Sequence, residues 1–251
     1  MGYYNYQQGL IVHHLNEEGT WNTHLRNCRN FILKSLDFYK PSVVTVLGSG
    51  WLLDLPLNEM NDLVSEIILV DIVHPPEVKS QVATLKRVSL REEDVTGGLI
   101  KQVWEKASGR AFFNKLRSIK EIKVAEYQPT FESGLIISLN ILTQLEALPL
   151  EFLRKRTKAD NESFLQFRKE IQTSHISFLE KNNSVLITDI SEIITERNGQ
   201  IIEKPSLLAA LPDTNFREEW TWDFENKSPD FYSKRSAFRV AGLFFQNKTG
   251  D

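Results

Sequence analysis

Gly48 and Gly50 flank Ser49 directly after Val43–Leu47, an apolar run rich in β-branched residues. Glycine lets the backbone turn with positive φ and lets a ligand approach the chain closely. The next apolar run ends in Asp71, about 20 residues after the loop, where a carboxylate can accept hydrogen bonds from ribose hydroxyls. Together these residues predict a site for a nucleoside cofactor. The alternative is a plain strand-to-helix turn, with Asp71 capping a strand end or the next helix.

Two more polar residues follow apolar runs. Asp94 comes after a weaker run, 85–90, and Asn140 comes directly after Leu135–Leu139. At these positions Asp94 can accept a hydrogen bond from an adenine amino group, and Asn140 can bind a ligand. Alternatively, Asp94 and Thr96 form a turn, and Asn140 satisfies backbone groups where the strand ends.

The elements that must position these residues are short apolar runs, most of them apolar on both faces. That pattern is typical of parallel strands covered by helices on both sides. Helical stretches separate the runs, as βαβ units require. The sequence therefore predicts an α/β fold with a doubly wound, Rossmann-like and mostly parallel sheet, with strands at 43–47, 66–70, 85–90, 135–139 and 185–188.

Three stretches predict helices. Apolar residues repeat at helical spacing over 20–36 and again over 162–182, which indicates amphipathic helices. His175 lies on the apolar stripe of the second one, so we interpret it as a packed core histidine. The stretch 95–121 predicts two short helices with a break near Ser108.

The C-terminal part changes character. Asn198-Gly199 is the dipeptide favoured in two-residue type I′ hairpins. The segments 218–224 and 236–247 then follow without a long helix between them, and they predict an antiparallel pair that closes the sheet. The chain has no internal repeat and no low-complexity linker, so we expect one domain over 1–251.

Composition narrows the class of protein. The chain has 251 residues, of which 41% are hydrophobic and 25% charged, and its net charge is -3. An acidic balance favours a small-molecule substrate over a nucleic acid. With Cys28 as its only cysteine and no secretory signal, the chain suits a reducing, cytoplasmic setting. No apolar run reaches the roughly 20 residues that a membrane span needs. The oligomeric state stays open.

Read in order, the motifs resemble a known family. The stretches "VVTVLGSG", "IILVDIVHP", "REEDVTG", "LIISLNILTQL" and "VLITDI" look like the serial motifs of class I S-adenosylmethionine-dependent methyltransferases. The closing "WTWDF" and "AFRVAGLFF" match the antiparallel last two strands of that fold. More narrowly, "GTWNTHLRNCRNFI" and "LGSGWLLDLPL" resemble a set of poorly characterised bacterial methyltransferase-like proteins. The resemblance covers nearly the whole chain and implies a seven-stranded doubly wound fold.

The resemblance also implies a cofactor site. S-adenosylmethionine would bind along the strand ends, on Gly48, Ser49, Gly50, Asp71, Ile72, Asp94, Val95, Leu139 and Asn140. In that arrangement the glycine loop surrounds the methionine and ribose, and Asp71 takes the ribose hydroxyls. Asp94 lies at the adenine edge, and Asn140 lies near the sulfonium.

The loop departs from the family pattern at two positions. Val46 stands where the family usually has an acidic residue, and the third glycine is replaced within 51–53. Asp54, one helical turn beyond the expected start of a helix near Trp51, can partly compensate. These departures motivate an alternative, a catalytically inactive module that binds S-adenosylmethionine or a nucleotide. A nicotinamide-dependent oxidoreductase is a third hypothesis, although the antiparallel C-terminal pair does not suit it.

The resemblance also implies that residues 1–40 form a helical lid ahead of a core at 41–251. Within the lid, Trp21, His24 and Arg26 can face the cofactor, and Arg26 can pair with its carboxylate. Alternatively, Trp21 is core, His24 is a satisfied half-buried histidine and Arg26 is solvated. The segments 95–128 and 191–219 are expected to roof the pocket.

The sequence does not assign a catalytic base. His24, His74 and Asn140 are candidates, and a methyl transfer to a strong nucleophile requires no base. No two histidines are spaced as H-x-x-x-H, so we expect no metal site.

Overall fold

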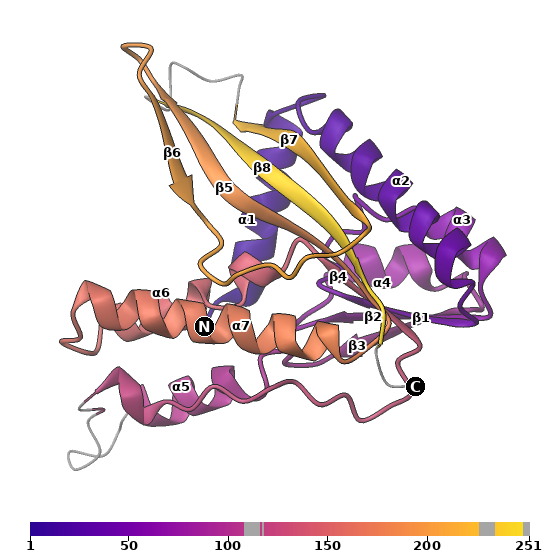
Figure 1. Cartoon of the computed structure of the whole chain (residues 1–251). Helices are drawn as coiled ribbons and strands as arrows, with labels where there is room; N and C mark the ends of the chain where they lie inside the picture. The colour runs from indigo at the N-terminus through magenta and orange to yellow at the C-terminus, as the bar shows by residue number, and fades with distance from the viewer. Residues whose placement is uncertain (108–115, 117, 226–233, 248–251) are drawn as a thin grey trace.

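The computed structural model describes residues 1–107, 116, 118–225 and 234–247. Its centre is one eight-stranded sheet whose main path runs β3-β2-β1-β4-β5-β8-β7, with β6 paired to β5 (Figure 1). The strands are β1 Val43–Leu47, β2 Glu66–Asp71, β3 Val88–Glu92, β4 Leu135–Leu139, β5 Ser184–Glu196, β6 Ile201–Pro205, β7 Arg217–Glu225 and β8 Lys234–Phe245. The first five are parallel, and β8 inserts antiparallel between β5 and β7. This confirms the predicted doubly wound sheet with an antiparallel C-terminal pair; β6 is an additional strand.

Helices cover both faces of the parallel part. They are α1 Tyr3–Asn16, α2 Asn22–Tyr39, α3 Leu57–Leu63, α4 Pro76–Val82, α5 Leu99–Ala107, α6 Ala147–Arg154 and α7 Asn161–Glu180, with short 3-10 turns at Ile119–Glu121 and Leu142–Gln144. The N-terminal helical extension, α1 and α2, is therefore also confirmed. No described helix combines the length and apolar character that a membrane crossing requires.

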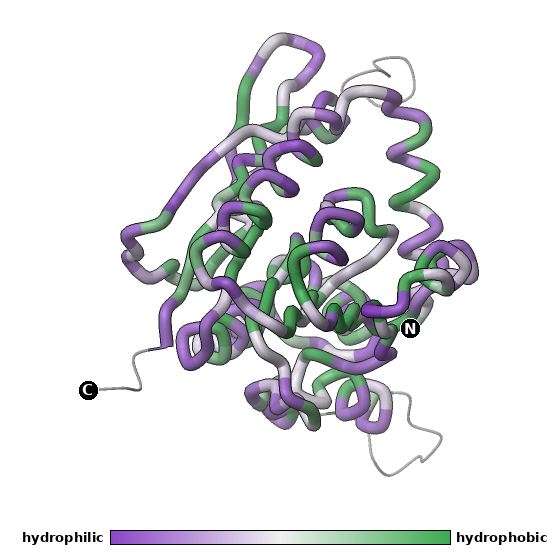
Figure 2. Tube along the Cα trace, turned by 90° about the vertical axis from the view of Figure 1, so that its right-hand side faces the viewer, coloured by the Kyte–Doolittle hydropathy of each residue, from purple (hydrophilic) through white to green (hydrophobic). Residues whose placement is uncertain are grey.

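The side chains of the parallel strands point alternately to the two faces of the sheet, and each face has its own hydrophobic core. In β1, Val44 and Val46 pack in the core under α2, α3 and α4, whereas Leu47 belongs to the core under α5, α6 and α7. Successive side chains of a strand point to opposite faces, so a strand buried on both faces needs an apolar residue at nearly every position. In Figure 2 purple and green residues alternate along the helices, as expected for helices with one face against the sheet.

The predicted amphipathic helices form close to their predicted limits. The buried face of α2 includes Cys28 and Ile32, and α7 begins at an N-cap, Asp160, whose side chain accepts from Ser163 N at 2.8 Å. His175 is 3% exposed and its Nε2 lies 2.8 Å from Ser138 Oγ, which confirms it as a core histidine. Of the two short helices expected over 95–121, α5 ends at Ala107 and the predicted break lies outside the described residues.

The hairpin between β5 and β6 differs from the prediction. Its loop has three residues, because Glu196 N donates to Gln200 O at 2.9 Å and Gly199 N donates to Glu196 O at 2.9 Å. Gly199 alone takes a positive φ, 83°, so the connection is a type I turn followed by a bulge glycine and not a two-residue type I′ turn. Figure 1 shows this tip at the far end of a ribbon of β5, β6, β7 and β8 that extends beyond the helices.

Candidate functional site

The two glycines of the loop after β1 are required for different reasons. Gly48 has φ +80°, and a Cβ there would lie 2.7 Å from Ile141 Cβ and 2.9 Å from Leu139 O. Gly48 therefore lets the loop pack directly against the end of β4. Gly50 has φ +47°, but the nearest atom to a Cβ there is Gly48 O at 3.9 Å. Its amide donates to Asp71 Oδ2 at 2.9 Å, so Gly50 joins the loop to the end of β2.

The expected helix start near Trp51 is wrong. After Gly50 the chain makes two tight turns, with Leu52 in the left-handed region at φ +61°, and α3 begins only at Leu57. Leu52 is 5% exposed, so burial of its side chain offsets the backbone strain of a positive φ. The loop thus lacks the helix N-terminus that follows the glycines in common dinucleotide-binding loops.

Asp71 is 7% exposed, and its carboxylate is already held by the chain. Oδ1 accepts from Ile72 N at 2.8 Å and from Gln7 Nε2 at 2.9 Å, while Oδ2 accepts from Gly50 N. Burial raises the pKa of Asp71 above its ordinary value, although these hydrogen bonds act in the opposite direction. The side chain is therefore oriented before any ligand binds.

Gln7, on α1, is a pocket residue that the sequence interpretation missed. Its Nε2 donates both to Asp71 Oδ1 and to Val73 O, the latter at 3.2 Å. Because both neighbours are acceptors, the amide nitrogen must lie on that side. The amide oxygen Oε1 points the other way; it is buried and has no partner in the described part of the chain. An oriented, unsatisfied acceptor beside Asp71 suits a ligand hydroxyl or amine.

Asn140 lies where β4 ends, and its φ of +50° turns its side chain into the site. Asparagine tolerates this left-handed conformation better than most residues do. Its Nδ2 donates to Asp54 Oδ2 at 2.8 Å and lies 3.3 Å from His24 Nε2. Asp54, which comes from the turn after the glycine loop, is thus brought to the same place as Asn140.

Asp94 and Thr96 form a turn, which was the alternative to adenine binding at this position. Its Oδ1 accepts from Thr96 N at 2.9 Å and also from the Thr96 hydroxyl. Asp94 nonetheless lines the same cavity as Asp71. The turn and a role at the cavity wall are therefore compatible.

All but one of the twelve predicted cofactor residues surround one cavity of about 180 Å³ at the carboxyl ends of the parallel strands. They are Gly48, Ser49, Gly50, Asp71, Ile72, Asp94, Val95, Leu139, Asn140, Trp21 and His24. Sequence analysis missed Trp222 on β7, and within the expected lid it named no residue of α1, which lines the cavity with Tyr3, Tyr6, Gln7, Leu10 and Ile11. Of the two expected roof segments, 95–128 contributes Val95, Thr96 and Ile100 to the wall, whereas 191–219 contributes none.

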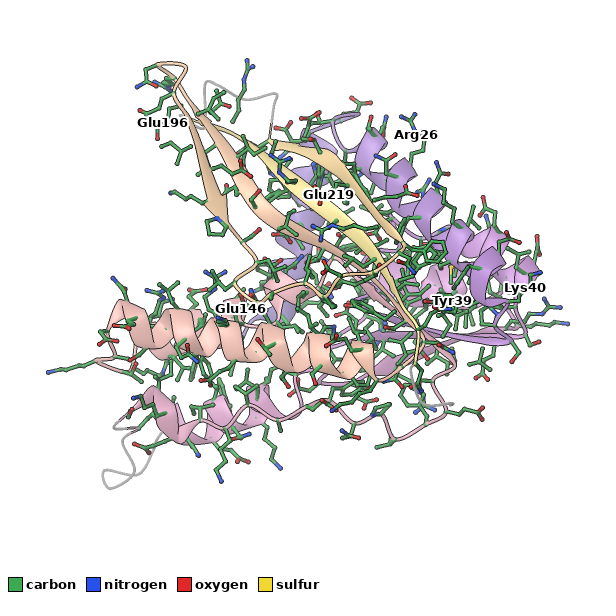
Figure 3. The ribbon with its side chains drawn as sticks, in the orientation of Figure 1. Arg26, Tyr39, Lys40, Glu146, Glu196 and Glu219 are labelled. Carbon is green, nitrogen blue, oxygen red and sulfur yellow. The ribbon has the colours of Figure 1, made fainter. Side chains whose placement is uncertain are left out.

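Arg26 is the exception, and its predicted place in the pocket is wrong. It is exposed, and Figure 3 shows it on the outer side of α2. Two helical positions separate it from His24, which corresponds to a rotation of about 200° around the helix. Trp21 and His24 face inward, at 5% and 2% exposure, and Trp21 Nε1 donates to Phe224 O at 3.0 Å. Both residues are therefore part of the core and of the cavity wall at once.

His24, Cys28 and Asp54 form a group of metal-ligand type, with one candidate atom from each lying within 4.8 Å of the others. The i, i+4 spacing of His24 and Cys28 is the sequence signal for this group. However, Trp220 Nε1 donates to His24 Nδ1 at 3.1 Å, so the hydrogen of the neutral ring must be on Nε2. Neither ring nitrogen then has a free lone pair for a metal ion. Asn140 Nδ2 also lies among the three groups, 3.8 Å from Cys28 Sγ. The arrangement fits a hydrogen-bonded network better than a metal site.

The charges in this network are set by burial. Burial lowers the pKa of His24 to about 3, so the ring is neutral at pH 7. Burial also raises the pKa values of the Cys28 thiol and of Asp54, although the hydrogen bond from Asn140 lowers both. Asp54 is consequently the group in this network that can hold a negative charge or a proton.

His74, the other histidine considered as a base, lies behind the loop. It is 2% exposed, its Nε2 lies 3.2 Å from Ser49 Oγ, and it does not line the cavity. His74 therefore supports the glycine loop from the side away from the cavity.

No protein-family model matches the chain, and no curated protein matches it. Among solved structures, the N-methyltransferase NodS from Bradyrhizobium japonicum WM9, in complex with S-adenosyl-L-homocysteine, is similar with a TM-score of 0.40 and 11% identity over 90% of this chain and 89% of NodS. DhpI in its complex with S-adenosylhomocysteine is similar with a TM-score of 0.35 and 7% identity over 95% of each chain. Both TM-scores lie below 0.5, so these similarities carry no conclusion about function.

Proposed function

We propose that the protein binds S-adenosylmethionine in the cavity at the strand ends and transfers its methyl group to a small molecule. The observation that carries the proposal is the end of β2: Asp71 is oriented by Gly50 N and lines the cavity next to Gln7, whose amide oxygen has no partner among the described residues. Two adjacent acceptors suit the two neighbouring hydroxyls of a ribose. A nucleoside placed there would have its base between apolar residues such as Ile72 and Val95.

The rest of the cavity supports the same ligand. Gly48, Ser49 and Gly50 would hold the part between ribose and amino acid, and Asp94 would lie at the adenine edge. Asn140 would lie near the sulfonium. When bound, S-adenosylmethionine supplies a methyl group on a positively charged sulfur, which becomes a neutral thioether once the methyl has left. The chain's own part is to orient the two reactants and keep water out.

Helices α1 and α2 act as a lid in this proposal. Trp51 Nε1 donates to Gln7 O at 2.9 Å, and His13 Nε2 lies 3.2 Å from Phe224 O, so α1 is tied both to the glycine loop and to β7. The lid and the core function as one domain. The buried Cys28 thiol suits a reducing, cytoplasmic setting.

One observation favours a second candidate, a module that binds the cofactor without catalysis. The glycine loop continues into turns through Leu52 and not into a helix, so no helix N-terminus faces the ligand. Binding of S-adenosylmethionine without methyl transfer to any acceptor in a broad screen would favour this candidate.

Calorimetric titration of S-adenosylmethionine and S-adenosylhomocysteine into wild type and Asp71→Asn tests the proposed function. We expect binding by wild type and affinity about 10-fold lower for Asp71→Asn, because the exchange replaces a charged acceptor by a neutral one. An exposed matched control, Asp62→Asn on α3, should bind like wild type. Absence of binding by folded wild type would refute the proposal.

A further inference from the structure

The cavity wall carries negative charge and no fixed positive charge. In the part of the chain that the structure describes, the lining includes four carboxylates and neither lysine nor arginine: Asp54, Asp71, Glu93 and Asp94. The one histidine of the lining, His24, is neutral at pH 7 because burial lowers its pKa to about 3. Such a wall attracts cations and repels anionic acceptors such as carboxylates and phosphates.

These carboxylates are not equivalent. Asp71 is bound by Gln7 and by two backbone amides, and Asp94 is bound by Thr96, so both belong to the walls at the ends of β2 and β3. Asp54 instead lies with Asn140 at the end of β4. No lysine or arginine nitrogen of the described residues lies within 4 Å of its carboxylate, and its one side-chain hydrogen bond there is donated by Asn140.

Aromatic rings complete this end of the cavity. His24 stacks on Trp222 with ring centroids 4.1 Å apart and planes inclined by 8°, and Trp21 packs edge-on to Trp222 at 5.0 Å. The faces of tryptophan rings attract cations when water is excluded. Asp54 has no lysine or arginine nitrogen of the described residues within 4 Å, although the charge of Arg29 acts on it from further away, and it shares the cavity wall with Trp21 and Trp222, a surrounding that suits an alkylammonium group.

We propose that the methyl acceptor is an amine, and that Asp54 binds its ammonium form and takes up the proton that the amine must lose before it attacks. This inference rests on the proposed function. An N–H bond of the ammonium breaks and an O–H bond forms on Asp54, which frees the nitrogen lone pair. The nitrogen then bonds to the methyl carbon as the carbon–sulfur bond breaks, with its electron pair kept by sulfur. The product is a methylated ammonium, and the proton on Asp54 passes to water.

The donor from Asn140 has a defined part in this step. Its hydrogen bond to Oδ2 stabilises the charged form of Asp54, whereas burial stabilises the protonated form. The two effects oppose each other, so the carboxyl group can bind an ammonium ion and also accept its proton. Asn140 is thus a positioning residue for Asp54.

The test compares two ligands that differ at the reacting position. Sinefungin carries an ammonium-bearing carbon in place of the methylated sulfur, and S-adenosylhomocysteine carries a neutral sulfur there. Calorimetry with wild type should give sinefungin about 10-fold or more tighter binding, the range for one hydrogen bond to a charged group. Asp54→Asn should abolish this preference and leave the affinity for S-adenosylhomocysteine within about twofold. Asp94→Asn, a control in the same cavity, should lower the affinities for both ligands by the same factor.

Equal affinities of wild type for the two ligands would overturn the inference, and this comparison does not depend on any variant folding. A preference that persists in folded Asp54→Asn would overturn the role of Asp54. Stoichiometric Zn²⁺ retained by wild type after dialysis and lost in Cys28→Ser would also overturn it, because Asp54 would then be a metal ligand. If neither nucleoside ligand binds, the proposed function itself fails.

Discussion

Replacing each glycine of the loop by alanine separates two contributions to stability: the packing of the added methyl group and the backbone conformation that the residue must adopt. At Gly48, alanine must adopt φ +80° and place its Cβ 2.7 Å from Ile141 Cβ and 2.9 Å from Leu139 O. At Gly50 the required φ is +47°, but no atom lies closer than 3.9 Å. Gly199, at the hairpin tip, has φ +83° with nothing within 4 Å, so Gly199→Ala measures the backbone cost by itself.

The magnitudes follow from these distances. A left-handed conformation costs an alanine about 1–2 kcal/mol, and overpacking of a close-packed site adds about 1–3 kcal/mol. We therefore expect Gly48→Ala to lower the free energy of unfolding by about 2–5 kcal/mol. Gly50→Ala and Gly199→Ala should each lower it by about 1–2 kcal/mol. If the proposed function holds, the added methyl group of Gly50→Ala also lies at the cavity wall and weakens the binding of S-adenosylhomocysteine.

Urea unfolding followed by tryptophan fluorescence measures these differences, with the slope of the transition checked for constancy. The difference between the free energies of unfolding of Gly48→Ala and Gly199→Ala isolates the packing contribution at Gly48. If the two variants lose the same stability, the contact between the loop and the end of β4 does not constrain Gly48. If Gly50→Ala is the most destabilised of the three, the assignment of roles to the two loop glycines is reversed and the reasoning fails.

Three further predictions concern other parts of the molecule. In wild type, removal of either the 2′- or the 3′-hydroxyl from adenosine should reduce affinity about 5–10-fold, and in Gln7→Leu one of these two removals should no longer reduce it; equal losses in both proteins would exclude Gln7 from ribose binding. Burial raises the pKa of Glu146 to about 7, so the folded state holds this proton more tightly than the unfolded chain. Stability from this group is complete below about pH 4.5 and falls as pH rises to about 7, by at most about 1.4 kcal/mol per pH unit. Glu146→Gln should remove that slope from urea unfolding measured between pH 4.5 and 7, and an unchanged slope would contradict the assignment. Tyr39 donates to Phe245 O at 2.8 Å, so Tyr39→Phe should lower the free energy of unfolding by about 1 kcal/mol in the same assay, and a urea midpoint equal to that of wild type would show that water replaces this bond.

Much of the fold was predictable because the parallel strands are local and strongly patterned. β1 and β4 form at their predicted limits, since runs that are apolar throughout have no solvent-exposed alternative once helices cover both faces of the sheet. The carboxyl ends of adjacent parallel strands share one edge, so Gly48, Asp71 and Asn140 could be expected to meet there. For the same reason, the position of the cavity at this edge followed from sequence alone.

Other features depended on contacts between segments that are distant in sequence. Gln7 reaches Asp71, 64 positions away, and Trp220 fixes the tautomer of His24, 196 positions away, and no local pattern encodes either contact. Arg26 was misplaced because two helical positions rotate a side chain to the opposite face, a difference that packing of the whole helix decides. Sequence periodicity determined the sheet and the edge at which its cavity lies, because burial of strands and helices is a local property. Only the tertiary structure decided that Asp54 lies beside Asn140, because their positions depend on how the glycine loop and the end of β4 pack together.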